Sequence, residues 1–290
     1  MTVKGKDVRF LLLVLLAGFS SLPMAAREKR IVGKLWGSID YDGAPWVENV
    51  SKPVKFKKGL YDRHLTVWAS HGRYYDNKKG VWKWQRPNLF CTTEDLFTQT
   101  IVYPYLLPML ENAGAVVFTP RERDWQTEEY IVDPDGGLNS TADDYKEYSE
   151  MGPWQSTGRP GFAAHGGSYV DGQNPFTDGQ CRMLEASKKA DKAFVKYQPT
   201  FRKAGRYAVY VSYQTVPGSV DDAHYTVFHR GQATELRVNQ QMGGGTWVYL
   251  GTFDFDAGNN IYNCVMLTNQ SRRRGVVTAD AVRFGGGMGN

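Results

Sequence analysis

The strongest constraint on the fold is the alternation of side chains in the C-terminal part of the chain. The segment that begins at Gly205 reads Gly-Arg-Tyr-Ala-Val-Tyr-Val-Ser-Tyr, so Tyr207, Val209 and Tyr213 fall on one face of an extended strand. Gly, Asn and Asp separate similar runs at intervals of about ten residues, which is typical of an all-β sandwich or jelly roll. Further strands are predicted at Ala193–Phe201, His224–His229, Thr234–Asn239, Thr246–Phe255, Asn260–Thr268 and Val276–Phe284. We place this jelly-roll-like β-sandwich domain at residues 162–290.

A different pattern, strand then helix then strand, occupies residues 54–125. A short apolar run at His64–Ser70 predicts a strand, and the spacing of apolar residues over Thr93–Asn112 predicts a helix. Two prolines within that helix remove backbone donors and are expected to kink or split it. A second strand is predicted at Ala115–Thr119, and a β-α-β unit implies parallel strands with a right-handed crossover.

The segment between these regions, residues 126–161, is polar and rich in turn residues, as in the run Asp-Pro-Asp-Gly-Gly at residues 133–137. We interpret this segment as a linker or irregular surface. The predicted fold class is therefore α+β, with a truncated β-α-β segment, a linker and an all-β sandwich in that order.

The N-terminus has the order of a secretory signal peptide. Basic residues up to Arg9 precede the apolar run Phe10–Phe19, and small residues close the segment at Ala26. The run is too short to span a bilayer, and no later segment is apolar enough to do so. We therefore expect a signal peptide at residues 1–26 and an N-terminal extension at residues 27–53. The product is expected to be exported (periplasmic, cell-surface or secreted), with no stable membrane anchor after cleavage.

The net charge is modest. It is +5 at pH 7, and removal of residues 1–26 takes away three basic residues and one acidic residue, which lowers it to +3. The basic block Arg272–Arg274 is then predicted to be a solvated loop rather than a nucleic-acid groove. We expect no nucleic-acid partner.

The three cysteines, Cys91, Cys181 and Cys264, are widely separated in the sequence. Because no Cys-x-x-Cys pair occurs, neither a thiolate metal site nor a dithiol redox motif is indicated. Cys264 lies within a predicted strand and is expected to be a buried packing residue. One disulfide bond remains open as a possibility after export.

Two residues of the first region are candidate zinc ligands. His71 follows the first predicted strand and Glu94 opens the helix, so both are expected at the sheet edge where ligands gather. An imidazole and a carboxylate are ordinary zinc ligands, but a catalytic zinc takes three protein ligands and a water molecule. This region supplies two ligands of such a site.

Three short motifs accompany these ligands. They are Ser-His-Gly at residues 70–72, Glu-Asp-Leu at residues 94–96, and a run Thr-Pro-Arg-Glu-Arg-Asp that ends at Asp124. Together they resemble the opening half of the zinc-dependent N-acetylmuramoyl-L-alanine amidases. The resemblance implies that His71 and Glu94 bind zinc and that Arg121 and Asp124 are structural or lie near the substrate. It also implies hydrolysis of the amide between muramic acid and the stem peptide.

The chain departs from that family pattern. The family has Asp-Pro-Gly-His-Gly-Gly where this chain has Val-Trp-Ala-Ser-His-Gly at residues 67–72, and the family's remaining His ligand and catalytic Glu lie in the second half of its fold. His165, His224 and His229 are the candidates for a replacement ligand, and the last two face opposite sides of one strand. We therefore expect a fragment or a catalytically incomplete protein, in which the zinc site is incomplete.

Longer motifs occupy the second region. They include residues 205–213, Asp-Asp-Ala-His-Tyr-Thr-Val at residues 221–227, and Thr-Ala-Asp-Ala-Val-Arg-Phe at residues 278–284. These motifs resemble the golvesin/xanthan-lyase carbohydrate-binding-like domain. The resemblance implies an exported protein associated with peptidoglycan or an extracellular polysaccharide. A non-catalytic carbohydrate-binding module and a xanthan-lyase-like polysaccharide-degrading protein remain alternatives.

Binding of a glycan by this domain requires aromatic rings that are exposed to stack on sugars. The aromatic candidates are Tyr213, Tyr225, Trp247 and Tyr249, although alternation also allows each of them to pack in the sandwich. The adjacent carboxylates of Asp221 and Asp222 are open to two interpretations, oxygen ligands for calcium or turn residues.

Overall fold

A computed structural model describes residues 43–52, 58–61, 63–69, 71–165, 169–170, 172–189 and 192–287. The expected signal peptide at residues 1–26 lies outside the described residues, as do residues 27–42 of the expected extension. The elements below all lie within one unit, Ala44–Asn290.

The C-terminal part of the chain is built of antiparallel sheets, as a β-sandwich requires. In the described part of the chain, the largest sheet has six strands in the order β1 (Val47–Asn49), β15 (Gln232–Val238), β14 (Ala223–His229), β17 (Cys264–Thr268), β12 (Ala193–Tyr197) and β9 (Tyr145–Ser149). A four-stranded sheet has the order β16 (Val248–Phe255), β13 (Gly205–Val211), β19 (Val282–Gly285) and β8 (Glu129–Val132). A three-stranded sheet has the order β10 (Gln155–Gly161), β11 (Gly179–Glu185) and β18 (Val276–Ala279).

These sheets share one hydrophobic core. On β12, Ala193, Val195 and Tyr197 are buried, whereas the intervening Phe194 and Lys196 are only partly buried. This is the alternation expected of a sheet with one face toward the core. On β13, however, every residue of Tyr207–Val211 is buried. The second face of β13 is therefore also covered.

The predicted strands are confirmed within a few residues at each end, with one exception. The stretch predicted as a single strand at Val276–Phe284 is divided between β18 and β19, which belong to different sheets. The break falls at Asp280, whose fully buried carboxylate accepts hydrogen bonds from the amide of Phe162 at 3.0 and 3.1 Å. The Asp280 side chain thus ties the break between the two strands to the backbone at Phe162.

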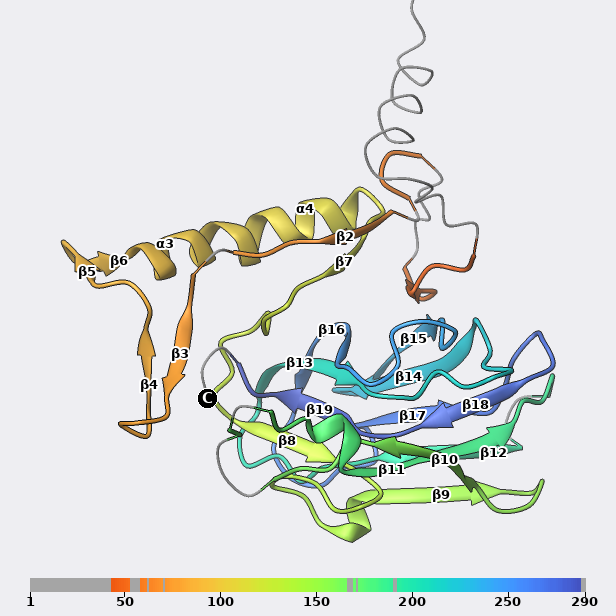
Figure 1. The fold of residues 1–290 in the computed structure, drawn as a ribbon. Coiled ribbons are helices and arrows are strands. Elements are labelled where there is room, and N and C mark those ends of the chain that lie inside the picture. Colours follow the sequence, from red (N-terminus) through yellow and green to blue (C-terminus); the bar gives the residue numbers. More distant parts are fainter. Residues whose placement is uncertain are drawn as a thin grey trace, which may run out of the picture. The chain divides into compact units, whose positions relative to one another are not determined.

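The interpretation of residues 126–161 as a linker was wrong. The segment contributes β8, β9 and β10 to the three sheets of the sandwich. Figure 1 shows β8 beside β19, strands that are far apart in the sequence and pair from Val282↔Val132 to Gly285↔Glu129. The extension also contributes an edge strand, since β1 pairs with β15. Edge strands such as β9, which expose many side chains, lack a strong apolar alternation.

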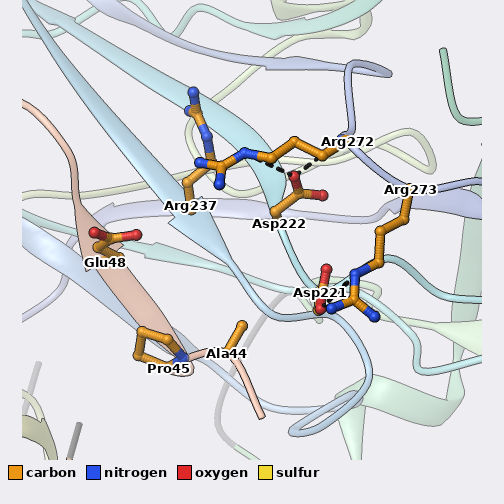
Figure 2. Close-up of a pocket in the computed structure, with 8 residues that line it drawn as sticks. All are labelled: Ala44, Pro45, Glu48, Asp221, Asp222, Arg237, Arg272 and Arg273. Atoms are coloured by element: carbon orange, nitrogen blue, oxygen red, sulfur yellow. Dashed lines mark hydrogen bonds and ion pairs between the residues drawn. The ribbon is translucent and has the colours of Figure 1, made fainter. Parts of the chain in front are cut away.

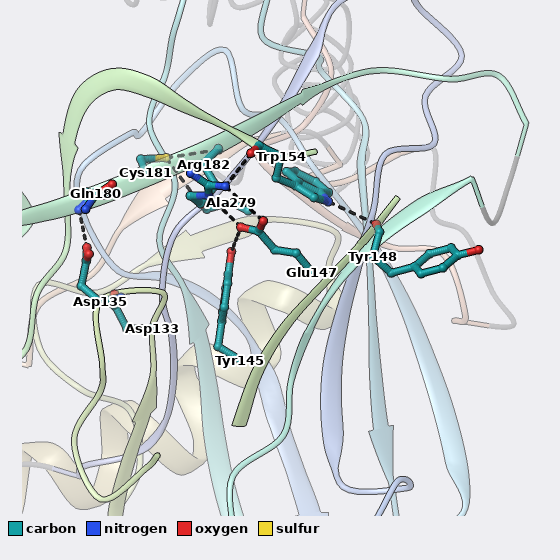
Figure 3. Close-up of polar contacts among 10 residues, drawn as sticks. All are labelled: Asp133, Asp135, Tyr145, Glu147, Tyr148, Trp154, Gln180, Cys181, Arg182 and Ala279. Carbon is teal, nitrogen blue, oxygen red and sulfur yellow. Dashed lines mark hydrogen bonds and ion pairs between the residues drawn. The ribbon is translucent and has the colours of Figure 1, made fainter. Parts of the chain in front are cut away.

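A polar network fastens this segment to the sandwich (Figure 3). Arg182 on β11 donates to Glu147 on β9 through Nε at 2.7 Å and Nη2 at 3.1 Å, and its Nη2 also donates to the carbonyl of Trp154 at 2.5 Å. The hydroxyl of Tyr145 donates to the same Glu147 carboxylate at 2.8 Å. Bidentate arginine–carboxylate pairs are geometrically specific. This network fixes the path between β9 and β10 and is structural.

The β-α-β prediction for the first region is confirmed in its topology. β2 (His64–Thr66) and β7 (Val116–Phe118) are parallel, and the helices between them run alongside both strands (Figure 1). The helical stretch comprises α3 (Glu94–Ile101), the π-helical turn η1 (Val102–Leu106) and α4 (Leu107–Asn112). Pro104 lies in η1 and Pro108 near the start of α4, so the prolines divide the helix as expected. The side chain of Thr93 caps α3 by accepting from the amide of Leu96 at 3.1 Å.

The remaining described elements are short. They are the hairpins β3 (Arg73–Asp76) with β4 (Val81–Trp84) and β5 (Asn88–Leu89) with β6 (Thr92–Thr93), and the 3-10 turns η2 (Ala142–Asp144) and η3 (Pro175–Thr177). Among the described residues, none of the helices has the length and apolar character needed to cross a membrane.

Candidate functional site

The two predicted zinc ligands, His71 and Glu94, differ in their surroundings: His71 contacts two side chains, and Glu94 is exposed to solvent. The ring of His71 contacts Gln85 Oε1 through Nδ1 at 3.1 Å and Arg86 Nη2 through Nε2 at 2.9 Å. Glu94 is exposed at the first position of α3. A guanidinium beside the imidazole opposes binding of a second cation at that nitrogen.

The zinc interpretation therefore does not fit the donor set. Across the described ranges, no cluster of three or more His, Cys, Asp or Glu side chains has the arrangement of a metal site. The three other candidate histidines each lie near a different polar side chain. Nε2 of His165 is 2.7 Å from Asp178 Oδ2, that of His229 is 2.9 Å from Thr234 Oγ1, and that of His224 is 3.9 Å from Asp222 Oδ2.

Arg121 and Asp124, expected to be structural or near the substrate, both bind backbone. Arg121 Nη1 donates to the carbonyl of Arg73 at 2.8 Å, which holds the start of β3. Asp124 Oδ2 accepts from the amide of Ala208 on β13 at 2.7 Å. Asp124 belongs to residues 122–128, which we call the connector, and its bond to Ala208 ties the connector to the backbone of β13.

The carboxyl group of Asp124 is in an unusual environment. It is 8 % exposed, and this burial raises its pKa to about 6. The hydrogen bond from Ala208 and the positive charge of Arg283 lower the pKa but do not offset the burial. Asp124 is thus a group that titrates in the slightly acidic range while holding the connector on β13.

A groove of about 680 Å³ lies along the connector, and we call it the connector groove. Its apolar wall comes from the helical stretch, including Tyr103, Leu107 and Pro108. Asp124 and Trp125 from the connector line it, and the opposite wall includes Arg206, Tyr249 and Thr252 of β13 and β16. Two predicted site residues, Asp124 and Tyr249, therefore line one groove although they are far apart in the sequence.

The aromatic groups of this groove differ in accessibility. Tyr249 is only partly exposed, and the guanidinium of Arg123 lies over its ring at 4.1 Å from the centroid. Trp125 is 52 % exposed and is the more accessible ring. Trp125 was missed from the sequence, because it is a single aromatic residue that follows the last predicted strand of the first region and belongs to no strand or helix pattern.

The other predicted glycan-binding residues do not provide open rings. Tyr213 is 0 % and Tyr225 is 1 % exposed, so the expectation that they stack on sugars is corrected: both belong to the core. The Tyr213 hydroxyl donates to the carbonyl of Met242 at 2.7 Å, which lets this polar ring be buried. Trp247 is partly buried against Phe162 and Phe176, with ring centroids 4.8 and 5.4 Å away.

Comparison with known proteins decides the family of the sandwich. The sequence matches the Golvesin C-terminal domain over residues 140–286. The chain belongs to this family. The golvesin domain thus begins before residue 162, and it includes β9 and β10 from the segment first interpreted as a linker.

The chain is also distantly related to xanthan lyase. It is 34 % identical over 92 residues to the xanthan lyase of Bacillus sp. (strain GL1), and this covers 31 % of the chain and 10 % of that protein. Among solved structures, Paenibacillus xanthan lyase gives a TM-score of 0.40 at 24 % identity, over 55 % of this chain and 13 % of that one. The K3 adhesin domain of Lys-gingipain from Porphyromonas gingivalis gives 0.26 at 14 % identity, over 55 % of this chain and all of that domain. None of these similarities involves an amidase.

Proposed function

We propose that this protein is an exported, non-catalytic module that binds an extracellular polysaccharide through the connector groove. The observation that carries the proposal is the half-exposed indole of Trp125 in a groove of about 680 Å³. An accessible aromatic ring among a few polar groups suits a sugar, whose ring has apolar faces and a hydroxylated rim. The relationship to xanthan lyase supports a polysaccharide as the ligand class.

The charges around the groove suit a hydroxylated ligand. Glu111 and Arg123 neutralise each other, with Oε1 and Nη2 2.6 Å apart. Arg206 is exposed and offers donors toward the groove. The hydroxyls of Tyr249 and Thr252 are 2.8 Å apart and offer a donor and an acceptor. Hydrogen-bonding groups from separate elements thus line the same groove as Trp125.

An amidase reaction is not part of this proposal. His71 and Glu94 lie in the β-α-β part of the chain, and the described residues supply no third ligand beside them. A carboxylate or histidine near a metal ligand would also be needed as a general base. The features on which the proposal rests are those of a binding groove.

The test is a screen of the purified protein against glycans. Native gel electrophoresis in the presence of soluble xanthan, dextran or polygalacturonate measures retardation by each polysaccharide, and co-sedimentation with peptidoglycan sacculi measures binding to the cell wall. Retardation or co-sedimentation with at least one glycan is expected. Unchanged mobility in every polysaccharide, together with no co-sedimentation, would contradict the proposal.

A further inference from the structure

A second pocket lies at the edge of the six-stranded sheet (Figure 2), and it shares no lining residue with the connector groove. We call it the edge pocket; its volume is about 210 Å³. It lies at the β1 edge, where Glu48 on β1 pairs with Arg237 on β15. Its lining residues are Ala44, Pro45, Glu48, Asp221, Asp222, Arg237, Arg272 and Arg273.

Two buried aspartates orient the arginines at the mouth of the edge pocket. Arg273 Nε is 3.1 Å from Asp221 Oδ2, and Arg272 donates its amide to Asp222 Oδ2 at 3.1 Å and places its Nε 3.9 Å from the same oxygen. Burial raises the pKa of Asp222, but the nearby imidazole of His224, 3.9 Å away, and hydrogen bonds from Ser271 and the Arg272 amide outweigh it and lower the pKa to about 2. Both arginine side chains are otherwise exposed, at 80 % and 69 %. The side-chain donors of both arginines are therefore accessible, and the 3.1 Å contact with Asp221 positions those of Arg273.

One polar side chain that lines the pocket, that of Arg237, has few hydrogen bonds to its neighbours. The side chain of Arg237 is 18 % exposed, and its Nε is buried without a hydrogen-bond partner among the described residues. Its Nη1 donates to the carbonyl of Leu236 at a long 3.4 Å, and its Nη2 is 3.9 Å from Glu235. Because Nε is closed to solvent and the contacts of both Nη atoms are long, the Nη hydrogens of Arg237 are the donors that a ligand oxygen can accept from.

The charge balance of the lining indicates the class of ligand. Three arginines and three carboxylates line the pocket, so their formal charges cancel. A ligand with a net charge would disturb this balance, whereas hydroxyl groups can accept from the arginines and donate to the carboxylates. The volume of about 210 Å³ lies below the roughly 300–1,000 Å³ typical of pockets for drug-sized ligands. It suits one sugar ring rather than a chain of several.

We propose that the edge pocket binds a single neutral sugar unit, with Arg237, Arg272 and Arg273 donating to its hydroxyl or ring oxygens. This inference extends the proposed glycan-binding function, because it gives the chain a second contact with a polysaccharide. Two linked contacts raise the apparent affinity without either becoming strong alone. The edge pocket and the connector groove involve different residues, so each can be tested without the other.

The experiment uses nuclear magnetic resonance of the arginine Nε–H groups during titration with methyl glycosides of glucose, mannose, galactose and N-acetylglucosamine. The Arg237 signal is expected to shift with at least one of these neutral sugars, and the shift should persist at high salt. Arg272→Ala should weaken binding about tenfold, the value for loss of one charged hydrogen bond. Arg274→Ala removes the same charge from the same exposed loop, outside the pocket lining, and should leave binding unchanged.

Three results would overturn the inference. One is an Arg237 signal that no neutral sugar shifts. The second is a shift that is given only by D-glucuronate, titrated alongside the neutral sugars, and is abolished by salt. If Arg272→Ala and Arg274→Ala changed sugar binding equally, a specific role of the edge pocket would likewise be excluded. Trp125→Ala should leave the Arg237 shift intact, so failure of the groove and failure of the edge pocket are separate outcomes.

Discussion

The guanidinium of Arg123 lies over the ring of Tyr249, with Cζ 4.1 Å from the ring centroid. The same side chain places Nη2 2.6 Å from Glu111 Oε1, and its backbone amide donates to the hydroxyl of Tyr210 at 3.0 Å. Arg123 therefore joins α4 to β13 and β16 at one point. Because the guanidinium covers Tyr249, it leaves Trp125 as the accessible ring of the connector groove.

Replacement of Arg123 should loosen this wall of the groove. Arg123→Ala is expected to lower the free energy of unfolding by about 2–4 kcal/mol, because a desolvated cation–π contact is worth about 2 kcal/mol and an ion pair is lost with it. A double-mutant cycle with Tyr249→Leu, measured by urea unfolding, isolates the pair. A coupling energy near zero would show that the two side chains do not stabilise one another.

Asp133 should make stability depend on pH. It is 2 % exposed, and burial, together with the nearby charges of Asp280 and Asp135, raises its pKa from 3.8 to about 8. The folded state holds this proton more tightly than the unfolded state, so this group costs stability as pH rises from about 4 to about 8, by up to about 1.4 kcal/mol per pH unit.

Asp133→Asn is the matching variant, because its amide oxygen can still accept from the amide of Asp135, as Asp133 Oδ1 does at 2.7 Å. Relative to the wild type, the variant should gain stability progressively between pH 4 and pH 8 and show no further gain above pH 8. Urea unfolding at a series of pH values measures this difference. Parallel stability curves across the range would contradict the assignment.

Asp280 should be required for the break between β18 and β19. Its carboxylate accepts from the amide of Phe162 and from the hydroxyl of Ser212 in the core. Asp280→Ala leaves both donors unpaired and is expected to destabilise the fold by about 2–4 kcal/mol, whereas Asp280→Asn retains an acceptor and should cost less. Chemical unfolding of both variants provides the comparison, and equal costs would argue against the hydrogen-bonding role.

The cysteines should differ sharply in reactivity. Cys91 is exposed, whereas Cys181 and Cys264 are 0 % and 3 % exposed, and burial raises the pKa of both thiols, that of Cys264 to about 11. A disulfide reagent at pH 8 is expected to modify one thiol per folded chain rapidly and all three after denaturation. Cys91→Ser should remove the rapid phase. Fewer than three thiols in the denatured wild type would reveal a disulfide bond.

The regular parts of the fold could be predicted because their patterns are local. Alternation on β12 and the helical spacing of residues 94–112 each reflect a single buried face. The polar strands β9 and β10 could not be recognised in the same way, because many of their side chains face solvent. Their pairing depends on distant partners, such as Arg182 for Glu147, which a local pattern does not contain.

The candidate site was less predictable than the fold. A tyrosine in a strand suits either face of a sheet. Tyr213 can be buried because the carbonyl of Met242, 29 residues further along the chain, accepts from its hydroxyl. One local feature could have marked Trp125 as an exposed aromatic residue: it lies between Asp124 and a run of polar residues. Its place beside Tyr249 follows only from the packing of the connector on β13 and β16.

The central claim is that Trp125 contacts a polysaccharide in the connector groove. The most direct test is the affinity of Trp125→Ala for the polysaccharide that retards the wild type most strongly in native gels. Trp68→Ala is the matched control, since Trp68 is 63 % exposed and lies outside the groove lining. Loss of one stacked aromatic ring should weaken binding of Trp125→Ala about tenfold or more, with Trp68→Ala unchanged. Equal affinities for Trp125→Ala and the wild type would contradict the claim.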